Sequence, residues 1–312
     1  MKTLCLLKFS ALGDLAQLEP FLPTLSKYYE ITLFTSPLGY SYFKSSPHIR
    51  HFIILPSKKF KDILFIIPKI FKKFDQFVDL QGNDRSKFLS FFSMTKHYSN
   101  YHKEFKIVSL SDELKPYIKK DSMYHIDLFS ILSMLKIPFE FAKFVPKQKE
   151  YIVLNCGSSP KWSSKRLPMS KWKEIANVLH ERYRLPFILT GNIGEREYCE
   201  NIGHTLELPF TNMAGKTTLE GLKDILNNAY LVVSTDSAAM HIAAICSTPT
   251  IGLFGPTNWV KSAPFGPWAT TLYDSLYYPS GIPAKVNSRE EKNYFDTISI
   301  LPALNLLAPY LK

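Results

Sequence analysis

The chain has 312 residues, 46% of them hydrophobic, and a formal net charge of +11. This length favours two domains of about 150 residues, each with enough apolar side chains for its own core. Charged residues interrupt every long apolar run, beginning with Lys8 and Asp14, so the sequence predicts neither a secretion signal nor a membrane-spanning helix.

The positive charge is unevenly distributed. Residues 1–150 hold 23 Lys and Arg against 14 Asp and Glu, whereas residues 151–312 hold 15 against 13. A basic amino-terminal half suits an anionic partner such as nucleic acid, a phosphorylated saccharide or a membrane surface. Taken alone, the charge favours the simpler interpretation of a lysine-rich solvated surface.

Strand-like and helix-like segments alternate through the first half. We expect strands at residues 4–9, 31–35, 51–55, 77–80 and 107–110, and helices at residues 13–27 and 124–135. Residues 58–73 combine six lysines with bulky apolar side chains. This composition suits a membrane-surface helix, although a helix that covers a sheet and turns its lysines outward is favoured. Pro68 in its middle predicts a kink or a break.

The second half repeats the alternation after a linker at residues 138–149. Strands are expected at 151–155, 186–190, 230–234 and 250–254, and helices at 170–183, 195–203, 219–229 and 238–245. Strands that alternate with helices predict parallel sheets covered on both faces. The sequence therefore predicts two α/β domains with a cleft between them.

The cysteines give a pointer to the compartment. Cys5, Cys156, Cys199 and Cys246 are scattered, lack the spacing of metal ligands and lie mostly in apolar contexts. We expect them to be reduced, buried thiols of a cytoplasmic protein.

Asp14 is the candidate catalytic residue of the first half. It follows the first strand in the run Ser10-Ala-Leu-Gly-Asp14, whose one glycine does not fit a dinucleotide-binding fingerprint. An acidic side chain at a helix start also disfavours a phosphate there. Asp14 could act as a general base, or it could simply stabilise the first turn through the helix dipole.

Candidate ligand contacts of the second half follow its strands. Ser158, Ser159, Lys165 and Arg166 could hold a diphosphate, or could belong to a solvated loop. Glu195 could bind ribose hydroxyls. Residues 217–220 fit a capping box with Thr217 as N-cap, which leaves Lys216 as a possible ligand contact.

Residues 230–257 are the most informative stretch. They predict a buried strand, a turn with Asp236 and Ser237, a helix of small residues and a second buried strand that ends at Gly255-Pro-Thr257. Free backbone N–H groups at the start of such a helix form an anion site, so a phosphate is the expected ligand. The alternative is an ordinary helix capped by Asp236 or Ser237.

Five motifs together resemble glycosyltransferase family 9, the ADP-heptose:lipopolysaccharide heptosyltransferases. They are residues 10–14 (SALGD), 79–82 (DLQG), 165–168 (KRLP), 214–219 (AGKTTL), and 236–241 (DSAAMH) with 253–257 (LFGPT). The resemblance implies the GT-B fold, an α/β architecture of two Rossmann-like domains whose parallel sheets face an interdomain cleft. Residues 1–145 would bind the acceptor, and residues 150–312 would bind the nucleotide-sugar. Whether the last helix packs back on the first domain stays open.

The resemblance also implies an inverting, metal-independent transfer of heptose from ADP-heptose to the lipopolysaccharide inner core, with lipid A–Kdo or a core heptose as acceptor and no cofactor. Asp14 resembles the catalytic base, and Lys165 resembles the group that stabilises the departing diphosphate. The other residues that the resemblance assigns to the donor are Ser158, Ser159, Glu195, Lys216, Asp236, Ser237, Ala238 and His241, and those assigned to the acceptor are Ser10, Gln81 and Arg85.

Departures from the family pattern keep alternatives open. Ala238 stands where the family usually has glycine, and Leu167 replaces an aromatic residue. A GT-B transferase with another nucleotide-sugar donor for a cell-surface glycan is therefore the alternative, and a basic nucleic-acid-binding protein is a weaker one. We expect a monomer in the cytoplasm of a Gram-negative bacterium that acts on an anionic, phosphorylated lipopolysaccharide precursor. Peripheral attachment to the inner membrane stays open.

Overall fold

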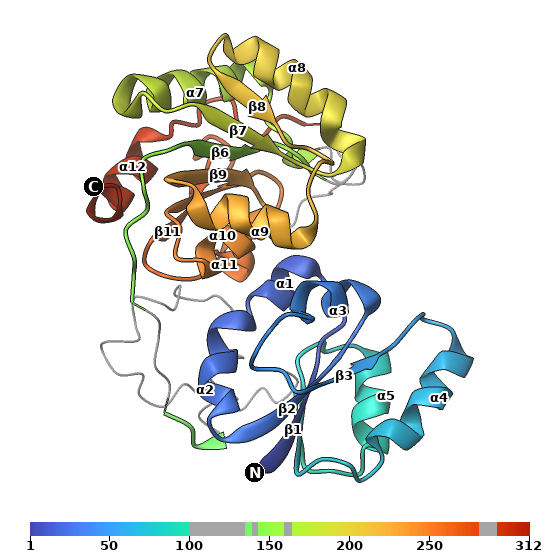
Figure 1. Cartoon of the computed structure of the whole chain (residues 1–312). Helices are drawn as coiled ribbons and strands as arrows, with labels where there is room; N and C mark the ends of the chain where they lie inside the picture. The colour runs from blue at the N-terminus through green and yellow to red at the C-terminus, as the bar shows by residue number, and fades with distance from the viewer. Residues whose placement is uncertain (100–134, 139–142, 159–163, 281–291) are drawn as a thin grey trace. The chain divides into compact units, whose positions relative to one another are not determined.

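The computed structural model describes residues 1–99, 135–138, 143–158, 164–280 and 292–312. These residues divide into two compact units, with residues 1–99 in the first and Lys143–Lys312 in the second. Both are α/β units (Figure 1). The predicted strand at 107–110, nearly all of the predicted helix at 124–135, and Ser159 lie outside the described residues.

The first unit contains a five-stranded parallel sheet. Its strands are β1 (Lys2–Leu7), β2 (Tyr29–Thr35), β3 (His51–Ile54), β4 (Gln76–Asp79) and β5 (His97–Ser99). Their spatial order is β3-β2-β1-β4-β5, so the order reverses between β1 and β4. In open parallel sheets, ligands bind at the carboxyl ends of the strands at such a switch point.

The helices of the first unit differ from the prediction in two respects. The expected helix at 13–27 is three short pieces, α1 (Leu12–Ala16), the 3₁₀ turn η1 (Glu19–Phe21) and α2 (Leu22–Ser26). Pro20 and Pro23, which lack a backbone N–H, each stand in the first turn of a new piece. Two unpredicted helices are α3 (Pro37–Phe43) and α5 (Asp84–Phe92).

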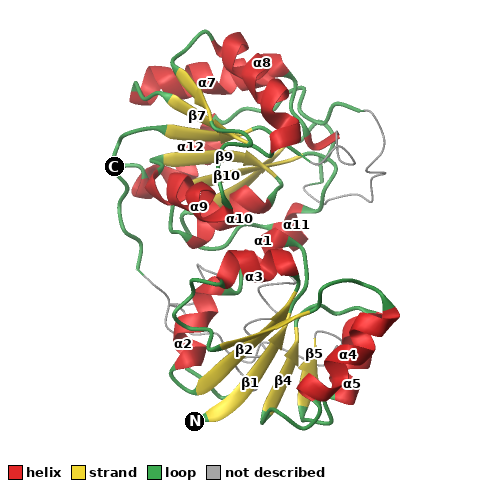
Figure 2. Cartoon of the chain, turned by 45° about the vertical axis from the view of Figure 1, so that its right-hand side comes forward, coloured by secondary structure: helices red, strands yellow, loops and turns green. Residues whose placement is uncertain are grey.

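The basic segment at 58–73 forms α4 (Phe60–Ile70), a helix that covers the sheet as favoured from the sequence. Pro68 lies inside α4, which continues to Ile70, so the predicted break does not occur at the proline. Ile63, Ile66 and Ile70 of α4 pack with Leu89 of α5 against apolar strand residues. Figure 2 shows α4 and α5 together on one face of this sheet and α2 on the other.

The second unit contains a six-stranded parallel sheet. Its strands are β6 (Ile152–Asn155), β7 (Phe187–Thr190), β8 (Phe210–Asn212), β9 (Leu231–Thr235), β10 (Thr250–Phe254) and β11 (Ala269–Tyr273). The order is β11-β10-β9-β6-β7-β8, with its switch point between β9 and β6. Both sheets have the arrangement of Rossmann-like units, which confirms the predicted fold class for each of them.

Helices cover this second sheet. They are α7 (Met169–Tyr183), η4 (Ile193–Glu195), α8 (Arg196–Leu206), α9 (Leu219–Asn228), α10 (Ala238–Ile245), α11 (Trp259–Ser262), α12 (Leu301–Leu307) and η5 (Ala308–Tyr310). Leu304 and Leu307 of α12 belong to the core of the same unit. Among the described residues, none of the helices combines the length and apolarity needed to cross a bilayer.

The predicted cap of α9 is wrong by one residue. Thr218, whose backbone is extended, is the N-cap, and its hydroxyl oxygen accepts a hydrogen bond from the Gly221 N–H at 3.1 Å. Thr217 therefore does not cap the helix, and Glu220 is not at the third helical position that a capping box requires.

Candidate functional site

Two loops meet at the switch point of the first sheet. Gln81, in the loop after β4, accepts hydrogen bonds through its side-chain oxygen from the N–H groups of Phe9 (2.8 Å) and Ser10 (3.0 Å), in the loop after β1. The Lys8 Nζ donates to the backbone oxygen of Leu80 at 3.1 Å. The predicted acceptor residue Gln81 thus holds the loop that carries Ser10, which is itself exposed.

Asp79 organises the turn that presents Gln81. This fully buried carboxylate accepts hydrogen bonds from the N–H groups of Gln81 (2.9 Å) and Gly82 (3.1 Å), and from the Ser86 hydroxyl (2.7 Å). A buried charge is tolerated only where hydrogen bonds or opposite charges compensate it. The 79–82 motif is therefore a positioning element. Arg85 follows it in the first turn of α5 and is half-buried.

Asp14 lies at the start of α1 beside a buried lysine. Its Oδ2 is 3.2 Å from the Lys8 Nζ, and the side chain of Lys8 is 5% exposed whereas that of Asp14 is 42% exposed. The same oxygen accepts a hydrogen bond from the Ala11 N–H at 3.3 Å. Asp14 thus lies in the first turn of α1, where the helix dipole favours a carboxylate, yet it is also open enough to meet a ligand. Lys8 was not predicted as a site residue.

The switch point of the second sheet is built around Asn155, at the end of β6. Its side-chain amide donates to the hydroxyls of Ser234 (3.1 Å) and Ser237 (2.9 Å), and its oxygen accepts from the Thr190 hydroxyl (3.1 Å). Asn155 therefore ties together the carboxyl ends of β6, β7 and β9. Asn155 was not predicted as a site residue, although a polar residue at the end of an apolar strand is a usable signal for one.

The start of α10 is the candidate anion site of the second unit. Ser237 occupies the N-cap position, but its side chain makes no capping hydrogen bond, because its hydroxyl is engaged with Asn155. The capping alternative is therefore wrong for the serine side chain. The first N–H groups of a helix and the positive end of its dipole attract phosphate. Ala238 is the first helical residue and is half-buried, whereas His241 is buried one turn later.

Lys165 and Asp236, two residues predicted from separate motifs, form an ion pair in this unit. The Lys165 Nζ is 2.8 Å from the Asp236 Oδ2 and also donates to the Asp236 backbone oxygen at 3.2 Å. Their side chains are 15% and 12% exposed. The pair places the Lys165 ammonium, held by the Asp236 carboxylate, beside the turn that leads into α10.

Arg166 fixes the loop that carries Lys165. One guanidinium nitrogen donates to the Ser158 backbone oxygen at 2.9 Å, and the guanidinium lies 4.6 Å from the centre of the Tyr198 ring. The Tyr198 hydroxyl donates to the Leu167 backbone oxygen at 3.1 Å, and burial raises the pKa of this tyrosine. Ser158 is therefore held near the end of β6, in a buried position.

Glu195 is buried in the loop after β7. Its Oε2 accepts a hydrogen bond from the Asn192 N–H at 2.8 Å, which caps the short turn η4. The carboxylate also lies so close to Gly157 that a Cβ there would collide with it. Lys216 is exposed in the loop after β8, next to Gly215, whose N–H donates to the Gly191 oxygen at 3.0 Å. The described donor residues thus lie on loops that follow strands of one sheet or in the first part of α10.

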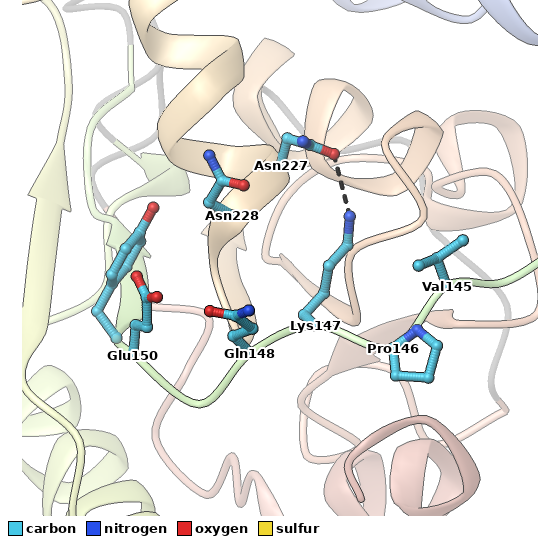
Figure 3. Close-up of a pocket in the computed structure, with 8 residues that line it drawn as sticks. Val145, Pro146, Lys147, Gln148, Glu150, Asn227 and Asn228 are labelled. Carbon is cyan, nitrogen blue, oxygen red and sulfur yellow. Dashed lines mark hydrogen bonds between the residues drawn. The ribbon is translucent and has the colours of Figure 1, made fainter.

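A pocket of about 570 Å³ lies elsewhere in the second unit (Figure 3). The linker and the end of α9 line it, and the Lys147 Nζ donates to the Asn227 side-chain oxygen (3.0 Å) and the Cys246 backbone oxygen (2.9 Å). Burial lowers the pKa of Lys147. Since α9 leads into the amino end of β9, this pocket lies at the amino-terminal edge of the sheet, opposite the candidate site. The hydrogen bonds of Lys147 hold the linker there. Across the described ranges, no group of three or more His, Cys, Asp or Glu is placed to hold a metal ion.

Comparison with known proteins agrees with the motif analysis. Residues 132–280 match the family model "Glycosyltransferase family 9 (heptosyltransferase)". The chain is 25% identical over 288 residues to the lipopolysaccharide core heptosyltransferase OpsX of Haemophilus influenzae, a match that covers 85% of this chain and 82% of that protein.

Two solved structures share the fold. A glycosyltransferase family 9 protein from Veillonella parvula has a TM-score of 0.72 at 18% identity, over 99% of this chain and 97% of that one. The E. coli heptosyltransferase WaaC with ADP-2-deoxy-2-fluoro heptose has a TM-score of 0.65 at 14% identity, over 92% and 96% of the two chains. The predicted GT-B fold class is confirmed.

Proposed function

Because this chain is a relative of glycosyltransferase family 9, we propose that it transfers a heptose from ADP-heptose to the inner core of lipopolysaccharide, with inversion at the anomeric carbon and without a metal ion. The observation that carries the proposal is the Lys165–Asp236 pair beside the start of α10, at the switch point of the second sheet.

The second unit supplies what a diphosphate leaving group needs. The N–H groups at the start of α10 and the ammonium of Lys165 provide positive potential at fixed positions. Donors that are fixed before the reaction stabilise the charge that develops on the departing diphosphate, without reorganisation during the step. The Lys165 side chain is held by Asp236 and its loop by Arg166, so its position is determined before a ligand arrives.

The first unit supplies the base. Asp14 would accept the proton of an acceptor hydroxyl while the hydroxyl oxygen forms its bond to the anomeric carbon. In the same step the bond from that carbon to the diphosphate breaks, so that ADP leaves and the configuration inverts. Lys8 keeps the carboxylate of Asp14 in place, and Ser10, Gln81 and Arg85 would bind the acceptor around it.

The donor and acceptor assignments rest on the relatives. OpsX is named as a lipopolysaccharide core heptosyltransferase, and WaaC was solved with an ADP-heptose analogue. The excess of Lys and Arg in residues 1–150 suits a phosphorylated acceptor. We also propose for this chain the cytoplasmic location, the monomeric state and the domain roles given above.

The test compares wild type with Asp14→Asn, which keeps the size of the side chain and removes the base. Transfer from ADP-heptose to a lipid A–Kdo acceptor should fall about 10²–10⁴-fold. ADP binding, followed by the rise in unfolding temperature, should not change, because ADP would bind to the other unit. Turnover like that of wild type would refute the assignment of the base. A panel of ADP- and UDP-sugars in the same thermal assay separates heptose from the alternative donors.

A further inference from the structure

The outer side of α4 and α5 exposes an unusual number of bulky apolar side chains. Phe65 is 72% exposed and Phe91 66% exposed, although the inner sides of the same helices pack normally into the core. We call this area the α4–α5 surface; its apolar members are Phe60, Leu64, Phe65, Phe71, Phe88, Phe91 and Met94. Single exposed apolar residues are ordinary, but a group on two adjoining helices marks an interaction site.

The two helices form one continuous surface. They lie side by side in both views (Figures 1 and 2), and their carboxyl ends are joined by a hydrogen bond from the Lys72 N–H to the Ser93 oxygen at 2.8 Å. Phe71 and Met94 are the chain neighbours of these two residues, so the apolar side chains continue from one helix to the other.

Lysines are interleaved with the aromatic rings. The exposed lysines of the two helices and their flanks are Lys58, Lys59, Lys61, Lys69, Lys72, Lys73, Lys87 and Lys96. The Lys69 Nζ lies 5.0 Å from the centre of the Phe65 ring, and the Lys72 Nζ lies 5.5 Å from that of Phe71. Residues 58–96 hold nine Lys and Arg against four Asp, so the acidic residues, including Asp84 beside Lys87, offset only part of this charge.

We propose that the α4–α5 surface docks onto an anionic lipid bilayer. Aromatic rings enter the boundary between headgroups and acyl chains, while lysines around them bind the headgroup phosphates. A merely solvated lysine face does not require exposed phenylalanines, and a protein partner would not by itself select such an excess of lysine. The proposal deepens the proposed function and rests on it in one respect, because a lipid-linked acceptor gives the protein a reason to meet a bilayer.

The test is co-sedimentation of the full chain with vesicles of phosphatidylcholine alone or with phosphatidylglycerol. Wild type should bind the anionic vesicles only, and less at high salt. Phe65→Ser with Phe91→Ser, and separately Lys61→Glu with Lys69→Glu, should each weaken the partition at least tenfold. All four side chains are exposed, and unchanged unfolding midpoints will show that the variants fold.

Matched controls make the same kinds of substitution outside the α4–α5 surface. Leu306→Ser removes an equally exposed apolar side chain from α12, and Lys27→Glu with Lys44→Glu makes the same charge change at the ends of α2 and α3. Both controls should bind vesicles like wild type. An equal loss in the controls, no binding of wild type to anionic vesicles, or a concentration-dependent dimer that Phe65→Ser abolishes in place of vesicle binding would overturn the proposal.

Transfer to a soluble, delipidated acceptor separates this proposal from the proposed function. The α4–α5 variants should retain the wild-type rate on that acceptor, since none of the substituted residues belongs to the candidate site. Transfer without vesicle binding refutes the docking surface alone. Vesicle binding without transfer of any sugar refutes the proposed function alone.

Discussion

Replacing Lys165 by methionine separates a structural from a catalytic role for the Lys165–Asp236 pair. The two side chains are 15% and 12% exposed, and the Lys165 Nζ is 2.8 Å from the Asp236 Oδ2, so the pair is intermediate between an exposed and a fully buried ion pair. Exposed pairs contribute about 0–1 kcal/mol, and breaking a fully buried pair costs about 3–5 kcal/mol. We expect Lys165→Met to lower the free energy of unfolding by about 2 kcal/mol, because Asp236 keeps an uncompensated charge.

The same variant should lower the turnover number about 10²–10³-fold, which is the usual cost of removing one fixed donor from a developing negative charge. Adding Asp236→Asn to Lys165→Met removes the uncompensated charge, so urea unfolding should recover most of the lost stability. Turnover should not recover, because the ammonium is still missing and Asp236 is itself assigned to the donor site. Recovery of turnover together with stability would refute the reasoning, since Lys165 would then act only through folding.

Lys171 offers a matched control for this experiment. It also pairs with a carboxylate at 2.7 Å, but its partner Glu174 is 53% exposed. Lys171→Met should therefore cost less than about 1 kcal/mol and leave turnover unchanged.

Three further predictions concern the packing beside Glu195 and two cysteines of the second unit. Gly157→Ala should lower the free energy of unfolding by about 1–3 kcal/mol in urea titrations, because its Cβ would collide with the Glu195 carboxylate. Gly221→Ala is the control, since its Cβ would make only ordinary van der Waals contacts. Equal stability of the two variants would contradict the packing argument. Cys246 should react with a thiol reagent in the native protein before Cys199, because Cys246 is partly exposed whereas burial raises the pKa of Cys199 to about 12. From an ordinary thiol value of 9.0, that raised pKa also predicts stability lost above about pH 9, where the unfolded chain ionises first. Faster labelling of Cys199 than of Cys246 would argue against the packing of α8.

Most strands were predicted because they are largely buried and therefore appear as short apolar runs. The strands β5, β8 and β11 were not predicted, since β5 and β8 have only three residues each and β11 is mostly half-buried. Residues 238–245 and 250–254 were predicted with the observed bounds, since a run of alanines between two apolar strands leaves little choice. The helix expected at 13–27 was overestimated because apolar spacing outweighed Pro20 and Pro23. The helix α3 was not predicted, although its start could have been recognised from the sequence, because Ser36 caps it and Pro37 is its first residue.

The supporting residues of the site could not be predicted in the same way. Lys8 bonds to Leu80 across 72 positions of sequence, and Asn155 bonds to Ser234 across 79. These pairs become neighbours only because the strand order reverses between β1 and β4 and between β6 and β9. A single sequence shows that strands are followed by polar residues, but it does not show which strands are neighbours in the sheet.

Each of the two switch points has a lysine paired with an aspartate, but the two pairs differ in how exposed their members are. In the first unit the lysine is covered and the carboxylate is open, with exposures of 5% for Lys8 and 42% for Asp14. In the second unit both members are largely covered, and the lysine stands beside the helix start that suits an anion. A covered cation that holds an open carboxylate leaves that carboxylate for a neutral hydroxyl. A carboxylate that holds a lysine beside free N–H groups positions a cation for a phosphate. The proposed division of labour between base and leaving-group stabiliser therefore follows from the exposed carboxylate in the first pair and from the position of the lysine beside the start of α10 in the second.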